Sequence, residues 1–403
     1  MKHTSAQEHS SETAARRETK PPQATRVHVA PGARVASATP AAQAGEPHIE
    51  RAGSYDAVLL SGFGGPEAQE DVLPFLRNVT RGRGIPDERL EEVAHHYRAF
   101  GGVSPINDHN RELRVALSEA LRAAGIDLPV YWGNRNWAPY LDDVLAEAAR
   151  DGVRRILAIP TSAYSSYSSC RQYREDWADA LESAGLETEL QIDKVRQFFS
   201  HPGFVEPFIA GVDAAVAEAE AAGHAREAIE VLFSTHSIPS ADASNSGAGL
   251  FADVEGGGYA AQHLAVAERV MAAAPDLAWQ LVYQSRSGAP STPWLEPDIN
   301  DAIEELTART AVIIVPIGFV SDHLEVLWDL DREARETAEE QGLWVRRVAT
   351  PGVDPAFVAA LVDLVRERVI GRPVGQRANT TSIGPWFDVC RPGCCAKGGA
   401  APR

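Results

Sequence analysis

The chain has 403 residues, of which 44% are apolar, so it can bury a large core and is long enough for two domains. Its net charge of −18 opposes contact with a phosphate backbone, so we expect no nucleic-acid partner. No apolar run approaches the ~20 residues that span a bilayer, and the N-terminus has no apolar signal segment. We therefore expect a cytoplasmic protein without a transmembrane segment, and nothing in the sequence demands more than a monomer.

The first 52 residues differ in composition from the rest of the chain. They contain no Leu, Phe, Tyr or Trp and are rich in Ala, Thr, Ser and Pro. Such a segment cannot bury enough apolar area to offset the entropy cost of ordering it. We predict a disordered tail over residues 1–52.

From Tyr55 onwards, short apolar runs alternate with longer amphipathic stretches, which is typical of βαβ units around a parallel sheet. The predicted strands are 56–60, 130–132, 156–159, 229–233, 279–283 and 312–315. Helical periodicity is clear over 113–123, 140–149, 204–221 and 357–369. The runs 156–160 and 312–316 have similar polar exits, which indicates two similarly built halves and hence an α/β fold.

Two glycine-rich or proline-rich loops follow predicted strands. Residues 61–67 (Ser-Gly-Phe-Gly-Gly-Pro-Glu) could bring backbone close to a ligand, but they lack the G-x-G-x-x-G spacing, and Pro66 at a helix start favours a plain tight turn. Residues 284–297 form a rigid loop in which we expect Trp294 to be anchored in the core.

His236 ends a predicted strand and begins a polar loop, Ser234-Thr235-His236-Ser237. The carboxyl end of a parallel strand is where α/β folds place their sites, and imidazole accepts a proton near neutral pH. The alternative is a histidine that merely caps the following turn.

Glu325, Asp329 and Glu333 recur every four residues and would form one row of carboxylates along a helix. Like charges at this spacing oppose the helix unless a cation offsets them. A solvated acidic face is the alternative, but the neighbouring Leu324, Leu327 and Trp328 favour a row that lines a cleft.

The four cysteines are Cys170, Cys390, Cys394 and Cys395. Their number and crowding do not suit a disulfide framework, whereas four thiolates can hold a structural zinc or a [2Fe–2S] cluster. The alternative is that Cys170 is an unrelated buried thiol and that the C-terminal cysteines form a redox-reactive segment.

Taken together, the motifs resemble the ferrochelatase family, in order from about residue 55 to about residue 369. The resemblance is carried by Phe63-Gly64-Gly65-Pro66, Arg81-Gly82-Arg83, Gly101-Gly102-Val103-Ser104-Pro105, Ser234-Thr235-His236-Ser237, Gln284-Ser285 with Pro293-Trp294-Leu295, and Gly318-Phe319-Val320-Ser321-Asp322-His323-Leu324-Glu325. It implies insertion of Fe²⁺ into a porphyrin, within haem biosynthesis. It also implies a class II chelatase fold, in which two similar doubly wound, Rossmann-like parallel-sheet domains enclose a porphyrin cleft.

The resemblance divides the chain after the tail. It implies a first chelatase domain over 53–200, a second over 201–350, a helix over 351–370 that packs back on the domains, and an irregular extension over 371–403 with the cysteine cluster. The family also implies a [2Fe–2S] cluster held by Cys170, Cys390, Cys394 and Cys395.

The resemblance also assigns the site residues. His236 and Glu325 match the essential histidine and glutamate, and Asp329 and Glu333 match a row of acids, so these four residues are the predicted metal site. We expect His236 to accept pyrrole protons and the carboxylates to handle Fe²⁺. The predicted porphyrin contacts are Phe63, Arg81, Ser104, Arg135 and Tyr283. Phe63 stands where one branch of the family has a tyrosine, so no hydroxyl is available there to bind metal axially.

The identity of the porphyrin is a finer expectation. The high Ala, Arg and Gly content and the C-terminal cysteines resemble actinobacterial members, which implies coproporphyrin III, with four propionates, over protoporphyrin IX, with two. Two other functions stay open: a chelatase that loads cobalt or nickel into a sirohydrochlorin, which usually places two histidines at the metal, and a porphyrin or haem carrier without chemistry.

Overall fold

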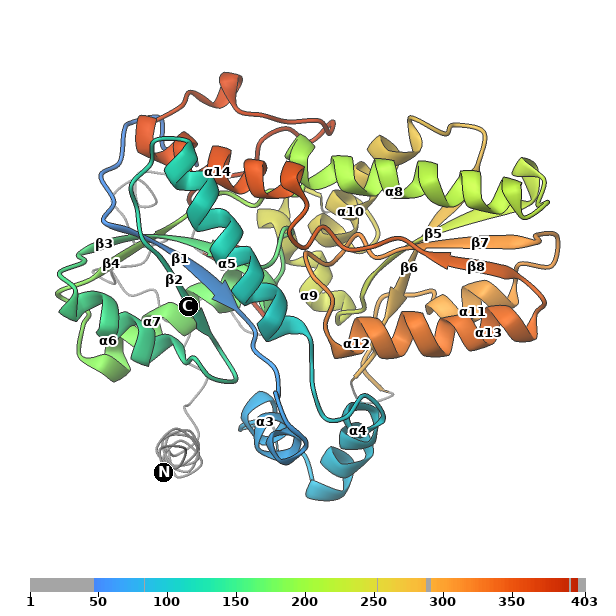
Figure 1. Ribbon diagram of the computed structural model, residues 1–403, viewed down its shortest axis with the longest axis horizontal. Helices are drawn as coiled ribbons and strands as arrows, with labels where there is room; N and C mark the ends of the chain where they lie inside the picture. The colour runs from blue at the N-terminus through green and yellow to red at the C-terminus, as the bar shows by residue number, and fades with distance from the viewer. Residues whose placement is uncertain (1–46, 83, 252, 288–290, 391–392, 398–403) are drawn as a thin grey trace, which may run out of the picture.

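The computed structural model describes residues 47–82, 84–251, 253–287, 291–390 and 393–397. These residues form two sheets of four parallel strands each, which lie side by side along the long axis of the molecule (Figure 1). The strand order is β2-β1-β3-β4 in one sheet and β6-β5-β7-β8 in the other, so the two halves have equivalent topologies. The predicted α/β fold with two similar domains is therefore confirmed.

The strands of the first sheet are β1 (Ala57–Gly62), β2 (Val130–Asn134), β3 (Arg155–Pro160) and β4 (Gln191–Lys194). Those of the second are β5 (Ile229–His236), β6 (Ala278–Gln284), β7 (Ala311–Val315) and β8 (Trp344–Arg347). The sequence did not predict β4 or β8. Both lie at sheet edges and read Gln-Ile-Asp-Lys and Trp-Val-Arg-Arg, so they lack the continuous apolar run that marks a strand buried on both faces.

Helices cover both faces of each sheet (Figure 1). The helices in the described residues are α3 (Val72–Val79), α4 (Asp87–Ala99), α5 (Ile106–Ala123), α6 (Leu141–Arg150), α7 (Gln172–Ala184), α8 (Pro202–Ala221), α9 (Ser240–Ser244), α10 (Gly257–Met271), α11 (Ile299–Glu304), α12 (Leu324–Val326), α13 (Ala334–Glu340) and α14 (Pro355–Ile370). Of these, α3 and α4 pack against each other away from the sheets (Figure 1). Two π-helical segments, Tyr167–Arg171 and Leu327–Glu333, precede α7 and α13. None of the helices in the described part of the chain is long and apolar enough to cross a membrane.

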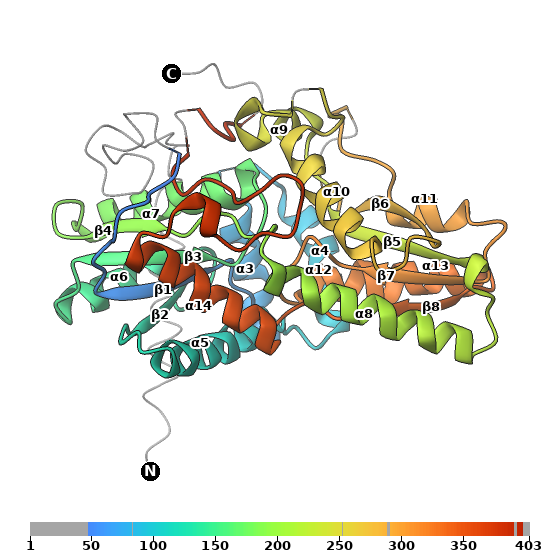
Figure 2. The ribbon, with the colours of Figure 1, turned by 90° about the horizontal axis from the view of Figure 1, so that it is seen from above.

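Alternate residues of the strands enter different cores. In β1, Val58 and Leu60 pack into a core that extends through both halves, whereas Ala57 and Leu59 pack on the other face with residues of α6 and α7. Helices α8 and α14 contribute to the shared core, and both lie on the same side of the two sheets (Figures 1 and 2). The domain boundaries at residues 52, 200, 350 and 370 stay predictions.

Buried ion pairs attach the end of α14 to the first half. Glu367 accepts hydrogen bonds from Nε and Nη2 of Arg196, at 2.9 and 3.1 Å, and both side chains are at most 1% exposed. The next residue, Arg368, donates to the hydroxyl of Tyr55 (2.8 Å). A charge left alone at such depth would be strongly unfavourable, so each of these groups depends on its partner. The C-terminal helix is thereby fixed against β1 and β4.

Residues 47–52, which the sequence assigned to the disordered tail, lie against the C-terminal extension. The backbone amide of Ile49 donates to Asp388 (2.8 Å), and its carbonyl accepts from Arg377 (2.9 Å), which also pairs with Asp388 at 2.7 Å. Ionic partners from the far end of the chain, together with the apolar packing of Ile49 on Val389, therefore order these residues. Residues 1–46 lie outside the described residues, and disorder there stays a prediction.

Asp363 of α14 is expected to stabilise the fold in a pH-dependent way. Burial raises its pKa, but hydrogen bonds from His201 (3.4 Å) and Arg372 (2.8 Å) lower it, with a net fall to about 2. Because the folded pKa lies below the ordinary value of 3.8, this stabilisation is present above that pH and is lost as the pH falls through about 2. Asp363→Asn should lower the free energy of unfolding by about 2 kcal/mol at pH 7.

Urea unfolding between pH 7 and pH 3 checks this expectation. The difference between wild type and Asp363→Asn should shrink to about half by pH 3. The control is Asp127→Asn, on the exposed loop between α5 and β2, which should change the free energy by less than about 0.5 kcal/mol. A difference for Asp363→Asn that does not vary with pH would contradict the assignment.

Candidate active site between the two sheets

A cavity of about 520 Å³ lies between the two halves, and its walls come from the carboxyl ends of both sheets. The loops that leave β1, β2 and β3 line it from the first half, and the end of β5 and the loop after β7 line it from the second. Parallel sheets place ligand sites at these ends, and the volume lies within the range of small-molecule sites.

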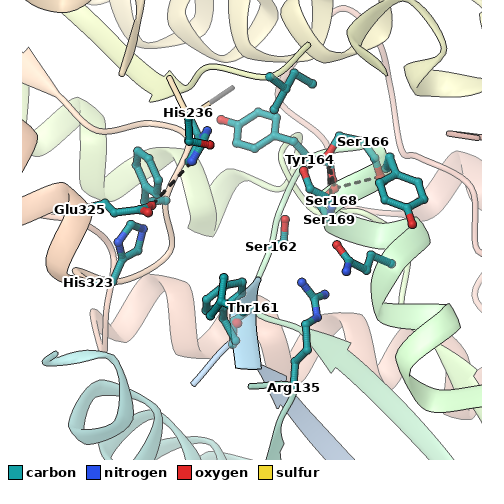
Figure 3. A pocket seen from close by; sticks show the side chains of 18 of the residues that line it. Arg135, Thr161, Ser162, Tyr164, Ser166, Ser168, Ser169, His236, His323 and Glu325 are labelled. Atoms are coloured by element: carbon teal, nitrogen blue, oxygen red, sulfur yellow. Dashed lines mark hydrogen bonds and ion pairs between the residues drawn. The ribbon is translucent and has the colours of Figure 1, made fainter. Parts of the chain in front are cut away.

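The cavity has two chemically different walls (Figure 3). The second half contributes a histidine wall, which carries His236, His323 and Glu325. The first half contributes a hydroxyl wall, which carries Thr161, Ser162, Tyr164, Ser166, Ser168 and Ser169. The histidine wall suits proton transfer and metal binding, and the hydroxyl wall suits hydrogen bonds to an anionic ligand.

The structure brings the two predicted central residues, His236 and Glu325, together. Nε2 of His236 lies 3.6 Å from a carboxylate oxygen of Glu325, and the two side chains are 33% and 50% exposed. Nδ1 of His236 lies 2.5 Å from the carbonyl oxygen of Ser237. Since a carbonyl only accepts, we assign the proton of the neutral ring to Nδ1, which leaves Nε2 as the free acceptor at the cavity.

A buried hydrogen-bond network that the sequence analysis missed holds the end of β5. The hydroxyl of Tyr259 donates to the carbonyl oxygen of His236 (2.9 Å) and lies 2.8 Å from the hydroxyl of Thr235. Thr235 in turn lies 2.9 Å from Nε2 of His263. Burial lowers the pKa of His263 to about 3, so this ring is neutral and works as a fixed hydrogen-bond partner. No spacing in the sequence links these elements, because the contact is made between α10 and β5.

Gly318, after β7, must be small because its backbone touches the same network. A Cβ there would meet the side chain of Thr235 at 2.2 Å for Oγ1 and 2.7 Å for Cβ. The loop after β7 can therefore pack directly against β5, which brings the following segment with Glu325 to His236.

The predicted α-helical row of acids is wrong in geometry. Glu325 lies in α12, but Leu327–Glu333 is π-helical, so residues four apart no longer stack in one line. Each carboxylate has a different partner: Glu325 faces His236, Asp329 accepts from Gln284 (3.2 Å), and Glu333 accepts from the indole of Trp328 (2.7 Å). Asp329 and Glu333 do not line the cavity.

The acids nevertheless affect one another. Burial raises the pKa of Asp329 to about 7, and the charges of Glu325 and Glu333 act in the same direction, against a hydrogen bond from Ser285. Gln284 connects this carboxyl to the strand of His236, because its side-chain oxygen accepts from Ser234 (2.6 Å) while its amide donates to Asp329. A cation near Asp329 would favour the ionised form.

His323 was quoted in a motif but was not predicted as a site residue. It lines the cavity, and burial lowers its pKa against the opposing effect of Glu325, so it offers a neutral imidazole in addition to the ring of His236. The number of histidines therefore does not separate this site from a two-histidine chelatase.

The structure places three of the five predicted porphyrin contacts at the cavity: Phe63, Ser104 and Arg135. Arg81 is exposed, donates to Asn78 and does not line the cavity, and Tyr283 is buried behind the wall with Ile238 and Leu295. Arg83, in the same motif as Arg81, lies outside the described residues. The glycine-rich turn is part of the site rather than a plain tight turn, since Phe63 and Gly64 both line the cavity.

Arg135 is held in place by groups that the sequence did not indicate. Its guanidinium pairs with Asp176, lies over the ring of Tyr173 at 4.6 Å and is 5.5 Å from the ring centre of Phe63. Its Nη2 atom is buried and has no hydrogen-bond partner among the described residues.

Three other cavity residues also have a buried polar atom without a hydrogen-bond partner among the described residues. The atoms are Nδ2 of Asn136, the hydroxyl of Tyr164 and Nε1 of Trp294. Trp294 is thus a cavity residue and is only half-buried, contrary to the prediction that it anchors its loop, and Leu295 is buried in its place. Buried donors without partners are unfavourable, so this cavity is suited to a ligand that accepts hydrogen bonds.

The four cysteines form one buried cluster, in which each residue is at most 4% exposed. In the sequence they lie far from the residues of the histidine wall. The sulfurs of Cys394 and Cys395 are 3.6 Å apart, and all four thiols are free. Hydrogen bonds from Cys170 and Cys394 lower the pKa of Cys390. Within the described residues, no group of three or more His, Cys, Asp or Glu side chains is placed to hold a metal ion, so ligation requires side-chain rearrangement.

A buried cation lies beside the cysteine cluster. Arg174 is 1% exposed, and its Nε and Nη2 atoms have no hydrogen-bond partner among the described residues. Burial alone would lower its pKa, but the four cysteine sulfurs raise it above the usual value. An uncompensated guanidinium at this depth is unfavourable, so the donor set and its surroundings fit a negatively charged four-thiolate group.

Thr235→Val should disturb the cavity without touching a ligand. The substitution removes the hydroxyl between Tyr259 and His263, so two buried polar atoms lose a partner, and we expect the free energy of unfolding to fall by about 1–3 kcal/mol. Because the same network holds the carbonyl of His236, kcat should fall as well. Thr235→Ser keeps the hydroxyl and is the control. Equal stability and activity for the two variants, by urea unfolding and metal-insertion rate, would contradict the network.

Comparison with known proteins identifies the family. A family model described as Ferrochelatase matches residues 55–369. A coproporphyrin III ferrochelatase of Leifsonia xyli subsp. xyli is 63% identical over 370 residues, which cover 89% of this chain and 95% of that protein. One of Streptomyces coelicolor is 55% identical over 370 residues (89% and 97%), and a ferrochelatase of Rhodopirellula baltica is 46% identical over 344 (85% and 93%).

One similar solved structure has low sequence identity to the chain. SirB from Bacillus subtilis with Fe³⁺ superposes with a TM-score of 0.47 at 13% identity, over 81% of this chain and 100% of that one. That likeness carries no argument about chemistry. The family match spans both sheets and every cavity-lining residue except Lys397, and the relatives align over nearly their whole length, so the chain belongs to the ferrochelatase family.

Proposed function

We propose that the protein inserts Fe²⁺ into coproporphyrin III, with His236 and Glu325 at the porphyrin centre. The observation that carries the proposal is the 3.6 Å approach of Nε2 of His236 to the Glu325 carboxylate inside the cavity. The names of the relatives supply the reaction and the substrate, since those of Leifsonia xyli and Streptomyces coelicolor are coproporphyrin III ferrochelatases.

In this proposal His236 accepts the pyrrole protons. Metal insertion releases two protons from the ring nitrogens, and a fixed neutral imidazole is a suitable acceptor near neutral pH. The bond to the Ser237 carbonyl keeps the Nδ1 proton away from the cavity, and Nε2 is left to accept. Glu325, directly opposite, would stabilise the imidazolium that forms.

The carboxylates handle the iron. Fe²⁺ accepts carboxylate and imidazole ligands, and Glu325, Asp329 and Glu333 extend from the cavity wall into the segment behind it. Asp329, whose pKa is raised to about 7, loses its proton readily when a cation approaches and binds it as a carboxylate. Glu325 is then the residue that passes iron to the ring.

The propionates bind at the hydroxyl wall. Arg135, from the same half of the chain, has a buried Nη2 atom without a partner, Asn136 beside it has a further unpaired donor, and Trp294 adds one from the second half. A carboxylate accepts several hydrogen bonds at once, so propionates would satisfy these atoms. Four propionates use such a wall more fully than two, which supports coproporphyrin III over protoporphyrin IX.

We further propose that Cys170, Cys390, Cys394 and Cys395 hold a [2Fe–2S] cluster. The support is the buried Cys₄ donor set beside unpaired Arg174. Its role would be structural, since it would attach the C-terminal extension to the first half of the chain. Zinc is the alternative occupant. A cytoplasmic location and a monomeric state, which the sequence predicts, are kept as part of this proposal.

The function is tested by anaerobic Fe²⁺ insertion with wild type and His236→Ala. Wild type should metallate coproporphyrin III faster than protoporphyrin IX, and His236→Ala should lower kcat by about 10²–10⁴-fold, because the proton acceptor is lost. The control is His224→Ala, whose ring bonds to Thr310 at the opposite end of the sheet, and it should retain full activity.

Other outcomes would contradict particular parts of this proposal. Porphyrin binding without turnover of any metal would make the protein a carrier. Faster turnover of protoporphyrin IX would contradict coproporphyrin III as the substrate. Preferred loading of cobalt or nickel into a sirohydrochlorin would contradict iron insertion as the reaction. Normal iron insertion by His236→Ala would remove the proposed proton acceptor.

The cluster is tested by metal and sulfide analysis of anaerobically purified protein. We expect about two iron and two sulfide per chain with thiolate-to-iron absorption, and loss of that absorption in Cys170→Ser. Arg174→Met removes the buried positive charge, so the reduction potential should fall because the reduced, more negative cluster is destabilised, and Arg174→Lys should restore much of it. One zinc per chain, or a potential that does not respond to Arg174, would contradict the assignment.

A further inference from the structure

The described part of the C-terminal extension reaches the cavity at Lys397. Lys397 is among the residues that line it, although it lies only two residues after Cys395 and far in sequence from every other part of the wall. Its Nζ atom is 5.6 Å from the ring centre of Tyr167, which belongs to the hydroxyl wall's loop. Ser166 and Ser168, on either side of Tyr167, line the same part of the cavity.

The positive charge of Lys397 is available at this position. Among the described residues, the cavity is lined by one arginine, Arg135, and one lysine, Lys397. Arg135 is already paired with Asp176. No carboxylate of the described residues lies within ion-pair distance of Lys397, and its side chain is exposed. A lysine held only by an aromatic ring keeps its capacity to bind an anion.

We propose that Lys397 is a substrate-binding residue that pairs with a propionate carboxylate of the porphyrin at the hydroxyl wall. The proposal rests on the proposed function, since it requires a porphyrin in the cavity. A carboxylate at this position would accept hydrogen bonds from the ammonium group of Lys397 and from the exposed hydroxyl of Ser168, whereas the buried hydroxyl of Ser166 already donates to Oγ of Ser169 at 3.0 Å. The cavity then has two cationic positions, Arg135 and Lys397, on the wall opposite His236.

The position of Lys397 depends on the cysteine cluster. Cys394 and Cys395 are buried directly before it, and Cys395 has a left-handed backbone (φ 54°) that turns the chain there. Ala396 is therefore the single residue between the buried turn and Lys397. A change that releases the cysteines should move this ammonium group and weaken porphyrin binding, even though no cysteine touches the ligand.

The proposal is tested by charge variants of Lys397 in the full chain with its cofactor content verified. Binding of metal-free coproporphyrin III is followed by fluorescence, and insertion kinetics give KM and kcat. Lys397→Met should raise Kd and KM about two- to fivefold with kcat unchanged, as for a partly exposed ion pair. Lys397→Glu should raise them further, Lys397→Arg should restore them, and the differences should shrink at high salt.

The matched control is Arg122→Met, which removes one exposed positive charge from the end of α5, outside the cavity. It should bind as wild type, so that an effect of net charge is excluded. Cluster absorption and the urea midpoint of Lys397→Met should equal those of wild type, because a purely structural role for the lysine would change both.

Two failures can be separated. If wild type binds or metallates no porphyrin, the proposed function fails. If wild type does so normally and Lys397→Met and Lys397→Glu bind coproporphyrin III like wild type at low salt, the function stands and the role of Lys397 is wrong.

Discussion

Parallel pairing of every strand constrains the whole molecule, because it directs the carboxyl ends of both sheets toward one place. The loops after β1, β2 and β3 reach the cavity from one half, and the end of β5 and the loop after β7 reach it from the other. Because the strand orders are equivalent, the two walls are built from corresponding ends of the two sheets, but they carry different side chains. Arg135 follows β2 in the first half, and His236 ends β5 in the second. A ligand between them meets hydrogen-bond donors on one side and a proton acceptor on the other.

This arrangement requires the halves to keep their relative position, and the C-terminal part of the chain contributes to that. Helix α14 adds to the shared core and is fixed to the first half by Glu367 and Arg368, which lie in ion pairs with almost no solvent exposure. The extension that follows pairs Arg377 with Asp388 and contributes three residues to the cysteine cluster. Charged groups thus provide order in a segment with few apolar side chains. Their burial makes each contact strongly dependent on its partner.

The sequence predicted the features that local pattern determines. Apolar runs identified the central strands and also the edge strands β2 and β6. The ordered motifs identified His236, Glu325 and the four cysteines, which the structure brings into two groups. It failed where tertiary contacts decide. The edge strands β4 and β8 carry polar residues, the acids after Glu325 lie in a π-helix, and His263 meets Thr235 only through the packing of α10 on β5. Tyr283 was assigned to the cavity by position alone, and the structure places it behind the wall.

The account depends on one porphyrin lying between the two walls, and a crystal structure with metal-free coproporphyrin III under iron-free conditions tests this most directly. The account predicts a ring in the cavity whose nitrogens face Nε2 of His236 and the carboxylate of Glu325, with propionates at Arg135 and the other unpaired donors of the cavity. A ring bound outside the cavity, or one in the cavity with His236 and Glu325 at its edge and the propionates turned toward them, would contradict it.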